Sequence, residues 1–174
     1  MKKIIYIDID DTLADFKGAV EKAKLVNPAM PFPQAEYGFY SNLIPLNGAI
    51  EAVKWFVNSD TFIPYLLTAP SVLNPMSYTE KRIWVEKHLG MDMVQRLIIC
   101  SDKSLLKGTY LIDDKIEGHG QDEFEGTVLQ YGSEMFPNWG AIVEVLSHEI
   151  EESNVLFYRF KTNSLKTKKT GLVD

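Results

Sequence analysis

The segment Asp8-Ile9-Asp10-Asp11-Thr12 is the most informative part of this sequence. It directly follows Ile4–Ile7, and an apolar run that ends in polar residues is typical of a buried strand. Three carboxylates are therefore expected to gather at the end of one strand. Like charges at such short range raise one another's pKa values or require a cation, and hard oxygen ligands suit Mg²⁺.

Short apolar runs that end in polar or turn residues recur along the chain, and each predicts a buried strand. After Ile4–Ile7 they are Phe62–Leu67, Leu97–Cys100, Tyr110–Ile112 and Thr127–Tyr131. Helical patterns lie between them, which predicts right-handed crossovers and a mostly parallel sheet covered on both sides. The predicted fold class is α/β with a Rossmann-like three-layer core. In such folds the site lies at the carboxyl ends of the strands.

Two of the predicted helices carry capping signals. The first follows Asn47, its predicted N-cap. Its apolar residues are spaced for one helix face and are Ala49, Ala52, Val53, Phe56 and Val57. The second spans residues 77–89, where Ser77 and Glu80 have the spacing of a capping box. Gly90 stands where a C-terminal glycine is expected.

The segment 17–45 interrupts the alternation of strands and helices. Pro28, Pro31 and Pro33 lie there between a helical stretch and a cluster of aromatic residues, and we expect a small helical cap inserted after the first strand. The phosphatase-like core would then comprise residues 1–16 and 46–150, with a last amphipathic helix after Asn138. Residues 151–174 are Lys-rich and are expected to form a partly disordered C-terminal extension.

Length and charge narrow the classes of function. A chain of 174 residues fits one domain with insertions. The net charge of −6 disfavours a nucleic acid polymer as the main partner, because backbone binding needs Lys and Arg. No apolar run approaches transmembrane length, so no membrane association is expected. A single cysteine, Cys100, fits a reducing compartment, and the expected location is the cytoplasm.

A second acidic pair, Asp113-Asp114, follows another apolar run, so both acidic sets should converge if the two strands are neighbours. A carboxylate can attack phosphorus, and another two residues on can protonate the leaving oxygen and then activate water. Asp8 and Asp10 suit these roles. The phosphate oxygens would need a fixed cation and a hydroxyl, and Lys103 and Thr68 each follow an apolar run.

Four features follow one another along the chain: Asp-x-Asp-x-Thr, a threonine at a strand end, a lysine and an Asp-Asp pair. Their order resembles that of the haloacid dehalogenase-like phosphatases. The resemblance is closest to the 5'(3')-deoxyribonucleotidase (5' nucleotidase, deoxy, cytosolic type C) branch and covers residues 4 to 120. The segments that carry it are Asp8-Ile9-Asp10-Asp11-Thr12-Leu13-Ala14-Asp15-Phe16, Ile83-Trp84-Val85-Glu86-Lys87-His88-Leu89-Gly90, Asp102-Lys103 and Leu111-Ile112-Asp113-Asp114-Lys115.

The resemblance implies a role for each matching residue. Asp8 would be the nucleophile and Asp10 the acid and base. Mg²⁺ would be held by Asp8, the Asp10 carbonyl and Asp113, with Asp114 as a further metal or water ligand. The phosphate would be bound by Thr68 and Lys103.

The implied substrate is a small phosphate ester, a nucleoside or deoxynucleoside monophosphate. Phe16 would lie against its base, since any base can stack on an aromatic ring. This chain departs from the branch at Asp11-Thr12, where Gly-Val is usual, and at Ser101, where relatives can carry Arg. Its cap is also shorter.

Several alternatives stay open at this point. A phosphatase of the same class could act on another small ester such as a sugar phosphate, or the chain could be a non-catalytic binding module. Phe16 and Trp84 could be packing residues, and the cap aromatics could form a small core of their own. A homodimer is also left open.

Overall fold

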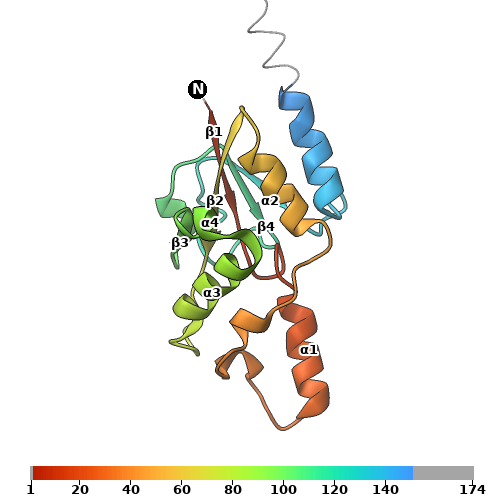
Figure 1. The fold of residues 1–174 in the computed structure, drawn as a ribbon, viewed down its shortest axis with the longest axis vertical. Helices are drawn as coiled ribbons and strands as arrows, with labels where there is room; N and C mark the ends of the chain where they lie inside the picture. The colour runs from red at the N-terminus through yellow and green to blue at the C-terminus, as the bar shows by residue number, and fades with distance from the viewer. Residues whose placement is uncertain (1, 151–174) are drawn as a thin grey trace, which may run out of the picture.

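The structure, a computed structural model, describes residues 2–150, so the predicted extension at 151–174 lies outside the described residues. A five-stranded sheet runs through its centre, with strand order β3-β2-β1-β4-β5 and all neighbours parallel (Figure 1). All five predicted strands are confirmed, and the α/β fold class with them. They are β1 (Lys3–Ile7), β2 (Phe62–Thr68), β3 (Leu97–Ile99), β4 (Tyr110–Asp113) and β5 (Thr127–Gln130).

The strand register places the polar strand ends side by side. In the central strand β1, Ile7 pairs with Leu66 of β2 and with Ile112 of β4. The amide of Asp8 continues the ladder by donating to the carbonyl of Ile112 at 2.9 Å. Because Thr68 and Asp113 end the two flanking strands, the expected convergence of the acidic sets occurs at one edge of the sheet.

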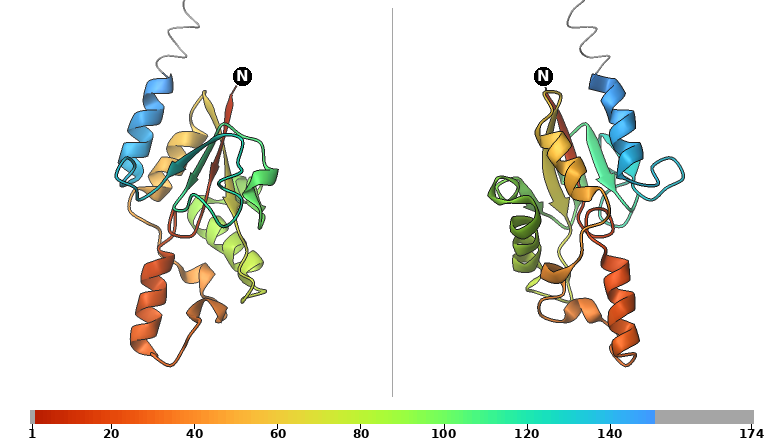
Figure 2. Two further views of the ribbon diagram at one scale, coloured as in Figure 1. Left: turned by 180° about the vertical axis from the view of Figure 1, so that it is seen from behind. Right: turned by 45° about the vertical axis from the view of Figure 1, so that its right-hand side comes forward.

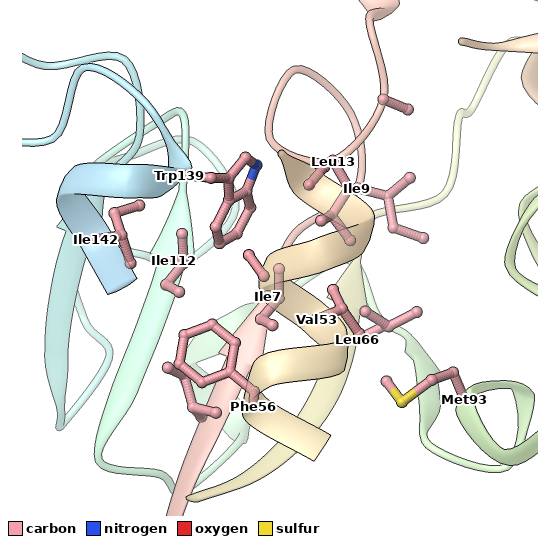
Figure 3. Packing of buried hydrophobic residues seen from close by; sticks show 14 of the residues in the cluster. Ile7, Ile9, Leu13, Val53, Phe56, Leu66, Met93, Ile112, Trp139 and Ile142 are labelled. Atoms are coloured by element: carbon pink, nitrogen blue, oxygen red, sulfur yellow. The ribbon is translucent and has the colours of Figure 1, made fainter. Parts of the chain in front are cut away.

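One face of the sheet is covered by helices. They are α2 (Ala49–Val57), α3 (Ser77–Leu89), α4 (Met91–Val94) and a helix over residues 139–150. Apolar side chains from these helices interlock with those of the strands, as Figure 3 shows for Phe56 of α2, Ile7 of β1 and Trp139 of the last helix. Full burial of each such side chain contributes about 1.5–3 kcal/mol.

The opposite face is covered differently. A smaller apolar cluster of Tyr6, Leu67, Leu111 and Phe124 packs against Leu106, which directly follows the 3-10 helix η3 (Lys103–Leu105), and loops cross this side of the molecule (Figure 2, left). The sheet is therefore covered on both sides, as predicted, but the segment that follows β4 forms loops where the crossover pattern favoured a helix.

A separate lobe lies beyond the carboxyl ends of the strands (Figures 1 and 2). It consists of α1 (Phe16–Val26), η1 (Pro33–Ala35) and η2 (Tyr40–Asn42). The chain leaves and re-enters the core through one narrow connection, where Ala14 bridges to Pro45. The lobe thus stands directly over the polar strand ends.

Two capping predictions are wrong. Helix α2 starts after Gly48, whose φ is +78°, so its N-cap is Gly48 and not Asn47. Helix α3 begins without a side-chain cap, because tertiary contacts recruit both residues of the expected capping box. The hydroxyl of Ser77 accepts the amide of Ser71, and Glu80 binds the lobe.

The C-terminal glycine of α3 and the helix predicted after Asn138 are both confirmed. Gly90 follows α3 with a φ of +82°, and its amide donates to the carbonyls of Val85 and Glu86. Asn138 precedes the last helix, and its Oδ1 accepts the amide of Ala141 at 3.1 Å. Within residues 2–150, none of the helices has the length and apolar composition needed to cross a membrane.

Candidate active site

A buried lysine joins the two acidic strand ends. The Nζ of Lys103, in η3, donates to Oδ1 of Asp8 at 2.7 Å and also to Oδ2 of Asp113. All three residues are at most 6% exposed. Burial alone would lower the pKa of Lys103, but the two carboxylates outweigh it and raise that pKa above its usual value. The ammonium stays charged and keeps one of its three N–H groups for another acceptor.

Asp113 is hydrogen-bonded at both of its carboxylate oxygens. Oδ2 accepts from Lys103 and, at 3.2 Å, from Nε2 of the buried Gln121, while Oδ1 accepts the amide of Lys115 at 2.9 Å. Burial, followed by the charge of Asp8, raises the pKa of Asp113. The sequence analysis did not predict a role for Gln121. This residue belongs to no motif and reaches Asp113 from the loop between β4 and β5.

Three carboxylates could hold a metal ion. Oxygens of Asp8, Asp113 and Asp114 lie within 4.8 Å of one another. Oxygens around one six-coordinate Mg²⁺ are about 3–4 Å apart, so a small adjustment suffices. All the donors are hard oxygens, and the buried negative charge needs a counterion. The residues present therefore fit a divalent cation.

The carboxyl group of Asp10 has two unlike oxygens. Oδ2 accepts from Nζ of Lys81 at 2.8 Å, whereas Oδ1 is buried and has no hydrogen-bond partner among the described residues. Burial raises the pKa of Asp10 to about 6, against the opposing effect of Lys81 and with a further rise from Asp8. Such a group can give and take a proton near neutral pH.

The sequence reasoning missed Lys81. This lysine of α3 is only 1% exposed, and its Nζ also donates to Oγ1 of Thr68 at 2.8 Å. A signal was present, because Lys81 has the i, i+3, i+4 spacing of one helix face with Trp84 and Val85. A charged residue on a buried face requires a partner.

A cavity of about 290 Å³ opens between the sheet edge and the lobe. The predicted residues Asp8, Asp10, Thr68, Lys103, Asp113, Asp114 and Phe16 all line it. The lobe adds Gln34 and Tyr40 to its wall. The structure thus brings every sequence-predicted site residue to one place.

The lobe aromatics pack mainly on one another. The ring of Phe16 stacks on Tyr40 with a centroid distance of 5.9 Å, and Phe39 meets both rings edge-on. Tyr37 is 82% exposed and lies outside this cluster. Phe16 therefore both packs within the lobe and faces the cavity. Trp84 is fully buried and donates to the carbonyl of Leu43 at 2.8 Å, which makes it a packing residue.

Asp11 explains one departure from the family pattern. Its φ is +58°, a region that favours glycine, and glycine is the usual residue there in the branch that the sequence resembles. The Asp11 carboxylate accepts the amide of Lys17 at 2.8 Å, which supports this conformation. The side chain of Lys17 in turn pairs with Asp114 at 3.2 Å and so links helix α1 to the acidic cluster.

The parallel sheet and its site define the class of protein. The aspartate pair after the central strand, the threonine that ends β2, the buried lysine and the second aspartate pair at the end of β4 are arranged as the resemblance to the haloacid dehalogenase-like phosphatases implies. The sequence also matches the family described as "5' nucleotidase, deoxy (Pyrimidine), cytosolic type C protein" over residues 30–134. The chain belongs to this family.

Curated relatives carry the same name in different organisms. A protein of Vibrio phage KVP40, provisionally named a 5'(3')-deoxyribonucleotidase, is 34% identical over 85% of this chain and 86% of its own length. The mitochondrial 5'(3')-deoxyribonucleotidase of Mus musculus is 28% identical over 83% of this chain and 73% of its own. The cytosolic-type enzyme of Homo sapiens is 37% identical over 49% of this chain and 43% of its own.

Proposed function

We propose that this phosphatase hydrolyses deoxynucleoside or nucleoside monophosphates with Mg²⁺, through an aspartyl-phosphate formed on Asp8. The observation that carries the proposal is the position of Lys103, which holds Asp8 and Asp113 together and keeps one donor for a phosphate oxygen. The carboxyl group of Asp10 supports the proposal, because it lines the same cavity as Asp8 and its raised pKa of about 6 suits proton transfer.

In the first step, an oxygen of Asp8 attacks phosphorus as the bond from phosphorus to the ester oxygen breaks. The leaving oxygen keeps the electron pair of the broken bond and accepts a proton from Asp10. The remaining N–H of Lys103 and the hydroxyl of Thr68 would bind the other phosphate oxygens and stabilise their charge. Thr68 is 1% exposed, so its hydroxyl is well fixed for this purpose.

Mg²⁺ would be held by Asp8, Asp113, Asp114 and the carbonyl of Asp10, and it would offset the repulsion between the nucleophile and an anionic phosphate. Asp114 is the ligand most available to it, since its carboxylate faces the exposed Lys17. Asp113, by contrast, is already hydrogen-bonded at both oxygens.

In the second step, a water molecule attacks the phosphorus of the aspartyl-phosphate on Asp8. Asp10, which lost its proton in the first step, accepts a proton from that water, and the bond to Asp8 breaks. Phosphate leaves, and both aspartates return to their starting states. One carboxyl group thus serves as acid and then as base, which suits its raised pKa of about 6.

The segment 17–45 would be the cap that selects the leaving group. Residues of this lobe form one wall of the cavity, and Phe16, at its junction with the core, presents an aromatic ring to it. Stacking on such a ring contributes about 1–3 kcal/mol per base. The relatives named above are 5'(3')-deoxyribonucleotidases, which favours a nucleotide over a sugar phosphate. The dimer and the cytoplasmic location stay predictions.

The test is phosphate release from a panel of substrates. The panel holds deoxynucleoside 5'- and 3'-monophosphates, ribonucleotides, sugar phosphates and an aryl phosphate, each with and without Mg²⁺. Asp8→Asn should abolish release, whereas Asp60→Asn, at a fully exposed position, should not. Selective Mg²⁺-dependent release from nucleotides is the expected result.

Two other outcomes would contradict parts of the proposal. Release from sugar or aryl phosphates alone would keep the mechanism and discard the nucleotide. No release from any ester, with or without Mg²⁺, would favour a binding module that keeps the fold and has lost the activity.

A further inference from the structure

The ammonium group of Lys81 uses all of its hydrogen-bonding capacity inside the protein. It donates to Oδ2 of Asp10 at 2.8 Å, to Oγ1 of Thr68 at 2.8 Å and to the carbonyl of Ala69 at 2.6 Å. An ammonium has three N–H donors and no acceptor, so none is left for a phosphate. Lys81 therefore differs from Lys103, which contacts only two carboxylates.

The contact with Asp10 separates the two oxygens of that carboxyl group. Because Lys81 holds Oδ2, the carboxyl group cannot rotate freely. The side chain of Asp10 is 26% exposed and lines the cavity, so the carboxyl group that Lys81 holds is within reach of a bound substrate.

The contact with Thr68 fixes the direction of a proton. Since Lys81 can only donate, the hydroxyl oxygen of Thr68 is the acceptor in this bond. The hydroxyl hydrogen must then point elsewhere and is free to donate toward the cavity that Thr68 lines. One buried cation thus orients both an acid and a donor.

The surroundings of Lys81 hold it in place. Its side chain is 1% exposed, and its Nζ lies 5.1 Å from the centre of the Tyr40 ring, a favourable cation–π arrangement. The preceding residue of α3, Glu80, accepts the amide of Tyr40 at 2.9 Å. Of these two consecutive residues of α3, Glu80 therefore contacts the lobe and Lys81 contacts Asp10.

We propose that Lys81 is a positioning residue for the reaction: it orients the carboxyl group of Asp10 toward the leaving oxygen and the hydroxyl hydrogen of Thr68 toward the phosphate. The inference rests on the function proposed above. As the ester bond to phosphorus breaks, the leaving oxygen takes the electron pair and then the proton of Asp10. Lys81 keeps all its protons throughout.

The test compares leaving groups that differ in their need for a proton. Lys81→Met removes the donors and keeps the length of the side chain. In single-turnover reactions, nucleoside release from a deoxynucleoside monophosphate should slow about 100-fold or more, because an alkoxide leaves poorly without general-acid help. Release of 4-nitrophenol from its phosphate, which needs little protonation, should slow less than about tenfold. Lys87→Met, on the exposed face of the same helix, should change neither rate.

Equal slowing of both reactions in Lys81→Met would overturn the proposal, because a purely structural or phosphate-binding role predicts it. Unchanged rates would also overturn it. Wild-type protein that hydrolyses neither ester would instead defeat the proposed function, so the two failures are distinguishable.

A double variant covers the case in which Lys81→Met does not fold. Asp10→Asn/Lys81→Met removes both charges and leaves no unpaired buried carboxylate. If Lys81 acts mainly through Asp10, the double variant should release nucleoside less than about tenfold more slowly than Asp10→Asn, the non-additivity expected of groups that act as a unit, with the remaining loss due to Thr68. A further loss of tenfold or more would contradict the proposal.

Discussion

The carboxylate of Glu80, in helix α3 of the core, accepts the backbone amides of Gly38 at 2.8 Å and of Tyr40 at 2.9 Å in the lobe. Glu80 is 2% exposed and lies 40 residues from Tyr40 in the sequence. Asn74 makes a similar link, since its amide donates to the carbonyl of Gln34 at 3.1 Å. Core side chains thus hold the backbone of the lobe beside the cavity.

Replacing Glu80 should loosen the lobe. Glu80→Ala leaves two amides without an acceptor, and each should cost about 1–3 kcal/mol of unfolding free energy unless water reaches it. Because Tyr40 lines the cavity, the KM for a nucleotide should also rise, by about fivefold or more. Urea denaturation and steady-state kinetics would check both effects. Glu86→Ala, on the same helix but exposed, is the control, and an unchanged KM in Glu80→Ala would refute the link between lobe and substrate.

Binding of Mg²⁺ should stabilise the protein. The three clustered carboxylates repel one another, and an ion that binds only the folded state adds about 2.7 kcal/mol at a hundredfold excess over its Kd. Titration of Mg²⁺ into chelator-treated protein should therefore raise the Tm. The increment should shrink strongly in Asp114→Asn and persist in Asp60→Asn. Equal increments in all three proteins would mean that the ion binds elsewhere.

The sequence was sufficient to predict which polar residues lie at the carboxyl ends of the strands and what chemistry they offer. A polar residue directly after an apolar run lies at a strand end, and this follows from local sequence alone. Asp8, Thr68 and Asp113 end up together for this reason. It could not predict Lys81 or Glu80 in their roles. Both lie on a helix that contacts the site through side chains, and their partners are up to 71 residues away in the chain.

Side-chain contacts with residues outside the helix also explain the wrong prediction of a capping box at the start of α3. A capping box depends on two side chains that have no stronger partner nearby. Here the hydroxyl of Ser77 and the carboxylate of Glu80 both have such partners. Residue spacing alone cannot reveal this competition, whereas the amide of Gly90 bonds to the last turn of α3 itself, and its predicted role is confirmed.

The stability of the metal-free protein should depend on the ionisation of Asp10. Its pKa is raised from 3.8 to about 6 in the folded state, so its contribution is present below pH 4 and is lost as the pH rises through 6. Asp10→Asn, which does not ionise, should match wild type near pH 4 and exceed it by about 1–3 kcal/mol near pH 8. Urea denaturation across this range in chelator would measure the difference. A constant difference at all pH values would contradict the shift.

A side chain at Gly120 should destabilise the protein and displace Lys103. Its φ is +78°, and an added Cβ would lie 2.1 Å from Oδ1 of Asp102 and 2.9 Å from the amide of Ser104. That same Oδ1 accepts the amide of Ser104 at 3.0 Å and so caps the 3-10 helix that carries Lys103. Any shift of Asp102 would therefore move the lysine that joins the acidic strand ends.

Gly120→Ala should consequently lose more than about 2 kcal/mol of unfolding free energy and at least about tenfold in kcat. Gly132→Ala is the matched control, since Gly132 has a φ of +80° and no atom within 4 Å of an added Cβ. Its cost should be the backbone strain alone, about 1–2 kcal/mol, with kcat unchanged. Chemical denaturation and initial rates on the same samples would separate the two effects. If both variants lost stability equally and kept full activity, the loop at Gly120 would have no part in holding Lys103.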